Sequence, residues 1–151
     1  MMKKAPAWGQ RAIAQLHWVY DEWFVVREKY QNCLEGMGVG CREVVDRQGR
    51  EIAGVVQLVV DREVQVDLGG LIQEESECCE CRRKKFLPVT VGMGPTVVAP
   101  ARGVNICKSS AWFGSGGQAF QLSIVSQAFR KAVMDCGIRG VSFRPLAVSS
   151  A

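Results

Sequence analysis

The sequence predicts a mixed α+β fold: one domain, residues 1–151, with a mainly antiparallel sheet and two short helices. Three observations lead to this prediction. The length is that of one ordinary domain. A strand-helix-strand pattern stands near the C-terminus with a weaker copy near the N-terminus, and strand-like runs dominate the middle. Hydrophobic residues at 48% and charged residues at 23% are typical of globular proteins.

The C-terminal copy covers residues 122–146. The run from Gln121 to Val125 is rich in strand-forming residues, and Ser126 is a good N-cap for a helix that follows. Apolar residues recur at helical spacing, at Phe129, Ala132 and Val133. Gly137 suits the end of the helix, where a positive φ is needed, and "VSF" at 141–143 predicts a second strand. This copy is therefore expected to be β-α-β.

The N-terminal copy covers residues 23–46. "EWFVV" lies in a stretch whose apolar spacing also fits a helix, and periodicity alone does not decide between helix and strand. Alignment with the C-terminal copy favours the strand. It pairs Val26 with Val125, Tyr30 with Phe129, Leu34 with Val133 and Gly38 with Gly137. The copies agree in apolar spacing and in glycine positions, which indicates an internal repeat, although chance similarity is the competing explanation.

Between the copies, short strands and loops are expected. Asp46 and Gly49 bound a turn, and "GVVQLVVD" and "VQVDL" read as strands. "GMGPTVVAPARG" and "GSGG" are punctuated by glycine and proline and are expected to be loops. Trp112 and Phe113 precede the second loop, and they are either core residues or interface anchors.

The clearest candidate metal ligands are Cys78 and Cys81. Their C-x-x-C spacing lets two thiolates reach one tetrahedral zinc ion, and the basic run Arg82 to Lys85 follows directly. A closed zinc site needs four ligands, and the remaining candidates are scattered: Cys33, Cys41, Cys107 and His17. Zinc, a redox dithiol and plain surface cysteines all remain open.

No catalytic motif stands out, so the chain is not expected to be an enzyme. His17 is the only histidine, and it lies in the aromatic stretch "LHWVYDEWF", where a packed histidine is the commoner outcome. The two glycine-rich segments lack the strand-to-helix context of a phosphate-binding loop.

Composition also predicts the cellular compartment of the chain and excludes some classes of partner. A net charge of +4 with one dense basic run is too little for a nucleic-acid footprint. No run approaches the roughly 20 apolar residues of a membrane span, and no apolar leader is seen. Seven cysteines without regular spacing do not resemble a disulfide scaffold. A cytoplasmic protein with reduced thiols is expected.

The segment "SIVSQAFRKAVMDCGIRGVSFRPLAV" resembles the C-terminal signature of bacterial immunity proteins that accompany polymorphic toxins, a group that includes the double-CxxCG type. The matching positions are Val125, Ser126, Phe129, Val133, Gly137, Gly140, Phe143 and Pro145. More weakly, "VVREKYQNCLEGMGVGCREVVDRQGREI" is similar to the first half of such proteins. The chain departs from the double-CxxCG pattern, because Arg82 replaces the glycine after the second cysteine and a second CxxCG is absent.

The resemblance implies a small cytoplasmic protein that neutralises a cognate toxin by binding it, without chemistry of its own. A stable complex of this kind buries on the order of 1,600 Å². The alternatives are a zinc-binding interaction module that uses Cys78 and Cys81, a dimer among its forms, or an accessory protein of another role.

Overall fold

The computed structural model describes residues 7–16, 22–69, 74–77, 82–88, 92–115 and 118–149. The chain divides into two compact units. The first contains Met1–Val60 and Val125–Ser142, and the second contains Asp61–Ile124 and Phe143–Ala151. Both contain β-sheets, in which the strand pairs are mainly antiparallel over the chain, and the first also contains two short α-helices, which confirms the α+β class. The single domain stays a prediction.

A four-stranded antiparallel sheet forms the centre of the first unit, in the order β1-β2-β4-β3. Its strands are β1 (Ile13–Leu16), β2 (Glu22–Val26), β3 (Gly40–Val45) and β4 (Glu51–Val59). "EWFVV" is therefore a strand, as the alignment predicts. Successive residues Phe24 and Val25 point to opposite faces, and both are buried. Burial on both faces explains why this strand lacks the alternating pattern of a half-exposed one.

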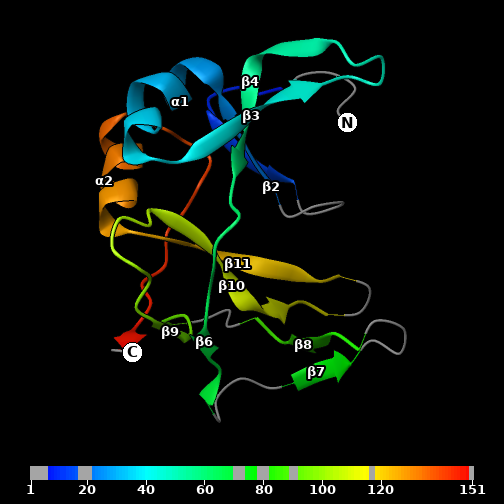
Figure 1. Ribbon diagram of the computed structural model, residues 1–151, viewed down its shortest axis with the longest axis vertical. Coiled ribbons are helices and arrows are strands. Elements are labelled where there is room, and N and C mark those ends of the chain that lie inside the picture. Colours follow the sequence, from blue (N-terminus) through cyan, green and yellow to red (C-terminus); the bar gives the residue numbers. More distant parts are fainter. Residues whose placement is uncertain are drawn as a thin grey trace. The chain divides into compact units, whose positions relative to one another are not determined.

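The turn expected between Asp46 and Gly49 joins β3 to β4 (Figure 1). The backbone N–H of Gly49 donates to the Asp46 carbonyl at 3.1 Å, and the Asp46 carboxylate accepts from the backbone of Gln48 and Arg50. These backbone hydrogen bonds, that of Arg50 above all, lower the pKa of Asp46. The turn prediction is confirmed.

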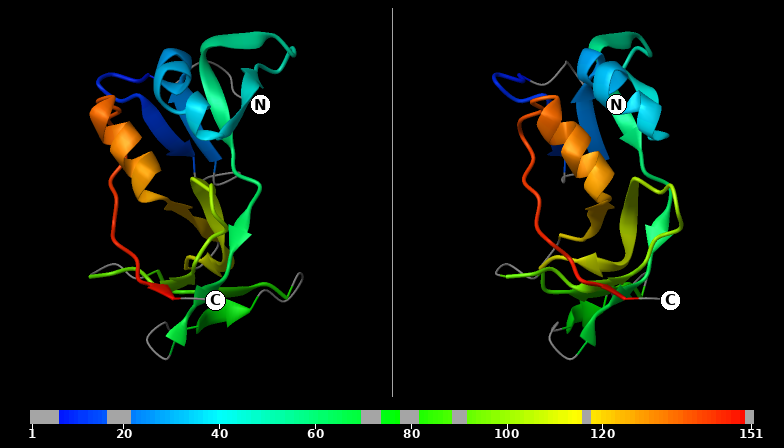
Figure 2. Two further views of the ribbon diagram at one scale, coloured as in Figure 1. Left: turned by 60° about the vertical axis from the view of Figure 1, so that its left-hand side comes forward. Right: turned by 90° about the vertical axis from the view of Figure 1, so that its left-hand side faces the viewer.

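Two helices follow the strands that the sequence places before them: α1 (Arg27–Cys33), continued by the short 3-10 turn η1 (Glu35–Met37), and α2 (Gln127–Asp135). The Ser126 hydroxyl accepts a hydrogen bond from the Phe129 N–H at 3.0 Å, which confirms the N-cap. Gly38 and Gly137 have φ angles of 69° and 61°, so both glycines occupy the left-handed conformation expected after the helices. Figure 2 shows the two helices next to each other.

The two copies differ after the glycine. The first continues into β3, whereas "VSF" at 141–143 forms no strand, so that prediction is wrong. β3 has β4 as its partner, but none of the described strands pairs with residues 141–143. Instead, the carbonyl of Arg139 accepts from the backbone N–H groups of Ala12 and Ile13, at 2.8 and 3.4 Å. The duplication itself stays a prediction.

The second unit contains two smaller sheets. In one, β11-β10-β8-β7 lie in this order, and β5 pairs with β10; the other has the order β12-β9-β6. The core contains Val64, Val97, Cys107 and Ile124. "VQVDL" is split between two short strands, and β9 lies inside the segment expected to be a loop. The bounds are β5 (Glu63–Val64), β6 (Val66–Asp67), β7 (Glu74–Glu77), β8 (Lys84–Phe86), β9 (Thr96–Val98), β10 (Ile106–Phe113), β11 (Phe120–Val125) and β12 (Val148–Ser149).

Candidate functional site: a disulfide between two helix ends and a charged sheet edge

The candidate zinc ligands Cys78 and Cys81, like His17, lie outside the described residues. The zinc site therefore stays a prediction. Among the described residues, no group of three or more histidine, cysteine, aspartate or glutamate side chains is placed to hold a metal ion. Of the two aromatic candidates, Phe113 is fully buried, and Arg83 lies over the half-buried Trp112 ring at 3.9 Å from its centroid.

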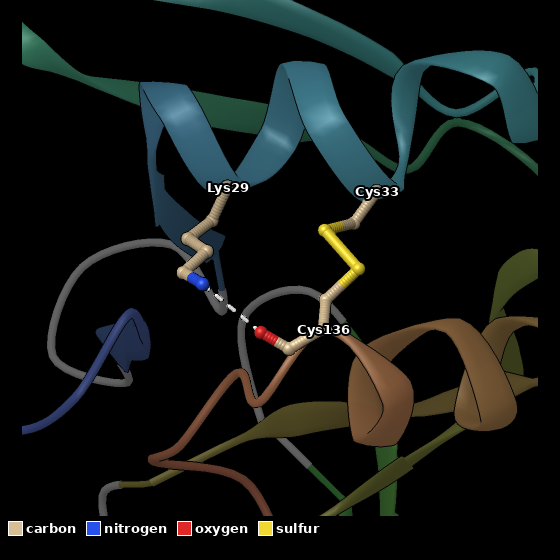
Figure 3. Close-up of a disulfide and its surroundings, with 3 residues drawn as sticks. All are labelled: Lys29, Cys33 and Cys136. Atoms are coloured by element: carbon tan, nitrogen blue, oxygen red, sulfur yellow. Dashed lines mark hydrogen bonds between the residues drawn. A yellow bond between two sulfur atoms is a disulfide. The ribbon is translucent and has the colours of Figure 1, made fainter.

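Cys33 and Cys136 form a disulfide between the ends of the two helices (Figure 3). Cys33 is the last residue of α1, and Cys136 is the C-cap of α2. Their Cα atoms are 6.4 Å apart, within the usual range for a disulfide, although 103 residues separate them in sequence. The expectation of reduced thiols is wrong for this pair. Both residues are partly exposed.

Lys29 adds a polar contact beside the disulfide. It lies one helical turn before Cys33, so both side chains leave the same face of α1. Its Nζ donates to the Cys136 carbonyl at 3.0 Å, as the dashed line in Figure 3 shows. A cation at this position also interacts favourably with the negative end of the α2 dipole. Two contacts, one covalent bond and one hydrogen bond, thus connect α1 to the end of α2.

Tyr30 connects α1 to Val39, the residue before β3. Its hydroxyl donates to the Val39 carbonyl at 2.7 Å, and its ring is buried. Burial, followed by the neighbouring Cys41, raises the pKa of Tyr30 to about 12. The hydroxyl therefore stays protonated and keeps donating throughout the ordinary pH range.

Two further thiols among the described residues are free. Cys41 on β3 is partly exposed, and Cys107 on β10 is buried in the core of the second unit. Burial raises the pKa of the Cys107 thiol, and its sulfur lies 3.7 Å from the Ile124 carbonyl. Cys107 is therefore shielded from thiol reagents as long as the second unit is folded.

An arginine is held across three strands of the four-stranded sheet. Arg42 on β3 donates to both carboxylate oxygens of Glu22 on β2 at 3.1 Å and to the Gln57 amide oxygen on β4 at 2.9 Å. The Arg42 side chain is still 60% exposed. A guanidinium with this exposure and a fixed orientation can bind a further carboxylate without first being ordered.

Glu43, the residue after Arg42 on β3, carries a negative charge and points to the opposite face of the sheet. The Glu43 carboxylate accepts from Arg27 at the start of α1, and Arg27 also donates to Glu51 at 2.6 Å. The Arg27 guanidinium lowers the pKa of Glu43, chiefly through their hydrogen bond. Half of the Glu43 side chain remains exposed. β3 thus carries a positive group on one face and a negative group on the other, both held by partners.

β3 is also the last strand of its sheet. Among the described strands, only β4 pairs with it, and none of them pairs with the other side of its backbone. We call the segment Gly40–Val45, with its exposed Arg42, Glu43 and Val45, the β3 edge. Open edges with charged side chains resist unspecific strand pairing, and they also serve as docking sites for a matching strand.

No protein-family model, curated protein or solved structure matches the chain. Within the described part of the chain, no helix is both long enough and apolar enough to cross a membrane.

Sequence inspection missed both features of this site. The disulfide joins residues that only the packing of α1 against α2 brings together. For the β3 edge a weak signal existed, because the turn at Asp46 predicts a hairpin, but the hairpin does not tell which of its strands ends the sheet.

Proposed function

We propose that the chain is a non-enzymatic binding protein of the immunity type, which neutralises a cognate toxin domain by docking it at the β3 edge. The open backbone of β3, flanked by charges of opposite sign that are already held in place, is the observation that carries the proposal. The resemblance of residues 123–148 to immunity proteins supplies the kind of partner.

The expected partner contributes an extended strand. Its backbone would pair with β3, and its alternate side chains would meet Arg42 on one face and Glu43 on the other. A strand with an acidic residue facing Arg42 and a basic residue facing Glu43 is therefore the best match. Such complementarity contributes mainly to specificity and to the rate of association.

Affinity measurements with purified toxin domain, encoded beside this chain's gene, test the proposal. We expect Arg42→Gln to weaken binding at least about tenfold, largely through slower association that depends on salt. The matched control is Arg50→Gln, because Arg50 is 76% exposed and also pairs with a carboxylate, but it lies in the turn beyond the strand. The control should bind within about twofold of the unaltered chain.

Two outcomes would contradict this proposal at different levels. If the unaltered chain neither binds the neighbouring toxin domain nor restores growth of cells that express it, the immunity function is wrong. If it binds, but Arg42→Gln and Glu43→Gln both bind as tightly as the Arg50→Gln control, then docking at the β3 edge is wrong.

A further inference from the structure

The position of the disulfide in the chain shows what it connects. Cys33 belongs to the first stretch of the first unit, Met1–Val60, and Cys136 to the second stretch, Val125–Ser142. The residues between these stretches, Asp61–Ile124, belong to the other unit. The disulfide is therefore a covalent connection between two parts of one compact unit that the sequence keeps far apart.

Noncovalent contacts hold the second stretch to the first as well. Phe129, Val133 and Ile138 are at most 5% exposed, and the Arg139 carbonyl accepts from the backbone of β1. A Cβ on Gly140 would come within 2.4 Å of the Ile13 carbonyl, which shows how closely the segment lies against β1. Residues 125–142 can therefore remain docked when the disulfide opens, although the covalent restraint against detachment is lost.

Both cysteines of the disulfide are partly exposed in the folded chain. The Lys29 ammonium group donates to the backbone carbonyl of Cys136, so this contact can remain in place when the sulfur–sulfur bond is broken. A reductant thiolate opens a disulfide by attacking one of its two sulfurs, and access to the sulfur governs the rate.

We propose that the Cys33–Cys136 disulfide is a thiol–disulfide exchange site for a dithiol reductant and that its reduction loosens residues 125–142 from the rest of the first unit. A reductant thiolate attacks Sγ of one of the two cysteines, forms a mixed disulfide with it and expels the thiolate of the other cysteine. The second reductant thiol then attacks the reductant's own sulfur in the mixed disulfide and expels the first cysteine. Two electrons and two protons pass to the cysteines, and the reductant becomes a disulfide.

This proposal also bears on the compartment. Disulfides of cytosolic proteins are usually transient and redox-sensing, whereas those of secreted proteins stay closed. The switch thus gives the disulfide a role in a cytoplasmic protein, and it does not depend on the toxin-binding proposal.

The first experiment treats the folded protein with dithiothreitol, alkylates samples over time and reads each cysteine by peptide mass spectrometry. Cys33 and Cys136 should become alkylated together, while the buried Cys107 stays protected. If these two cysteines become reactive only as fast as Cys107, opening requires unfolding, and the proposed site is a closed structural disulfide.

The second experiment tests the exchange step with reduced glutathione, quenched with acid early in the reaction. A mixed disulfide with glutathione should form on Cys33 or Cys136 of the folded protein, before the buried Cys107 becomes reactive. The absence of any mixed disulfide on these two cysteines would overturn the proposed exchange.

The third experiment follows hydrogen exchange of the α2 amides in the oxidised and reduced protein. Reduction should accelerate their exchange at least about tenfold more than it accelerates exchange of the amides shared by β3 and β4. Unchanged exchange in α2 would show that the disulfide does not restrain residues 125–142. Equal acceleration everywhere would show loss of the whole unit, and both results refute the loosening.

Discussion

Replacing Cys136 by serine should destabilise the first unit strongly, because the disulfide closes a long loop. In the chain-entropy model, a loop of about 100 residues contributes about 4.7 kcal/mol, and removal of a native disulfide typically costs about 2–5 kcal/mol. Cys33 and Cys136 are 103 residues apart. The contact with Lys29 uses the backbone carbonyl of Cys136, so serine leaves that contact in place. The expected loss is therefore that of the disulfide alone.

Urea unfolding followed by far-ultraviolet circular dichroism measures this loss. Both α-helices of the described residues belong to the first unit, so the helix signal reports on the part of the chain that the disulfide restrains. The free energy of unfolding follows from the midpoint and the slope of the transition. With a slope of about 2 kcal/mol/M, a loss of about 4 kcal/mol lowers the midpoint by about 2 M.

The controls separate the disulfide from the cysteines as such. Cys33→Ser, Cys136→Ser and the double variant should lose the same amount, since each removes the same bond. Cys41→Ser changes a free, partly exposed thiol and should alter stability by less than about 0.5 kcal/mol. A loss below about 1 kcal/mol in Cys136→Ser, or a marked difference between the two single variants, would refute the argument.

Three further predictions concern the elements that position α1 and α2. Tyr30→Phe removes the hydrogen bond to the Val39 carbonyl and should cost about 1–3 kcal/mol, measured by urea unfolding at neutral pH. Because folding raises the pKa of Tyr30 from 10.0 to about 12, its contribution to stability is complete below pH 10 and falls by about 2–3 kcal/mol as the pH rises through 12. The phenylalanine variant should lack this fall. Gly140→Ala places a Cβ against the Ile13 carbonyl at a φ of 112° and should cost about 2–4 kcal/mol by thermal unfolding, whereas Gly36→Ala meets no atom within 4 Å and should cost less than about 1 kcal/mol. Ser126→Ala removes the cap of α2 and should cost about 1 kcal/mol, and an unchanged midpoint would contradict the cap.

The features that the sequence predicts correctly are those set by neighbouring residues. Ser126 caps the helix that follows it, and Gly137 ends that helix, because both effects act within one or two turns of backbone. The turn at Asp46 is equally local, since the carboxylate bonds to amides two and four residues further on. These features determine where α2 begins and ends and where the turn between β3 and β4 lies.

The predictions from sequence are wrong where pairing with residues distant in sequence determines whether a segment forms a strand. "VSF" has the composition of a strand, but a strand needs a partner, and none of the described strands takes that place. The reverse holds for Thr96–Val98, which forms β9 inside a segment rich in glycine and proline, because β6 and β12 pair with it on either side. Composition alone reports neither the presence nor the absence of such partners.

The disulfide depends both on local structure, which the sequence predicts, and on contacts between distant residues, which it does not predict. Alignment of Leu34 with Val133 and of Gly38 with Gly137 already places Cys33 and Cys136 near the ends of two predicted helices. What the sequence lacks is the packing of these helices against each other, and without it any two of seven cysteines are equally good candidates. The observed pairing brings the two helix ends to a Cα distance of 6.4 Å, and Lys29 selects the same neighbour through an independent contact. Because the disulfide and the Lys29 hydrogen bond join the same pair of helix ends, the approach of these two ends is a specific feature of the fold.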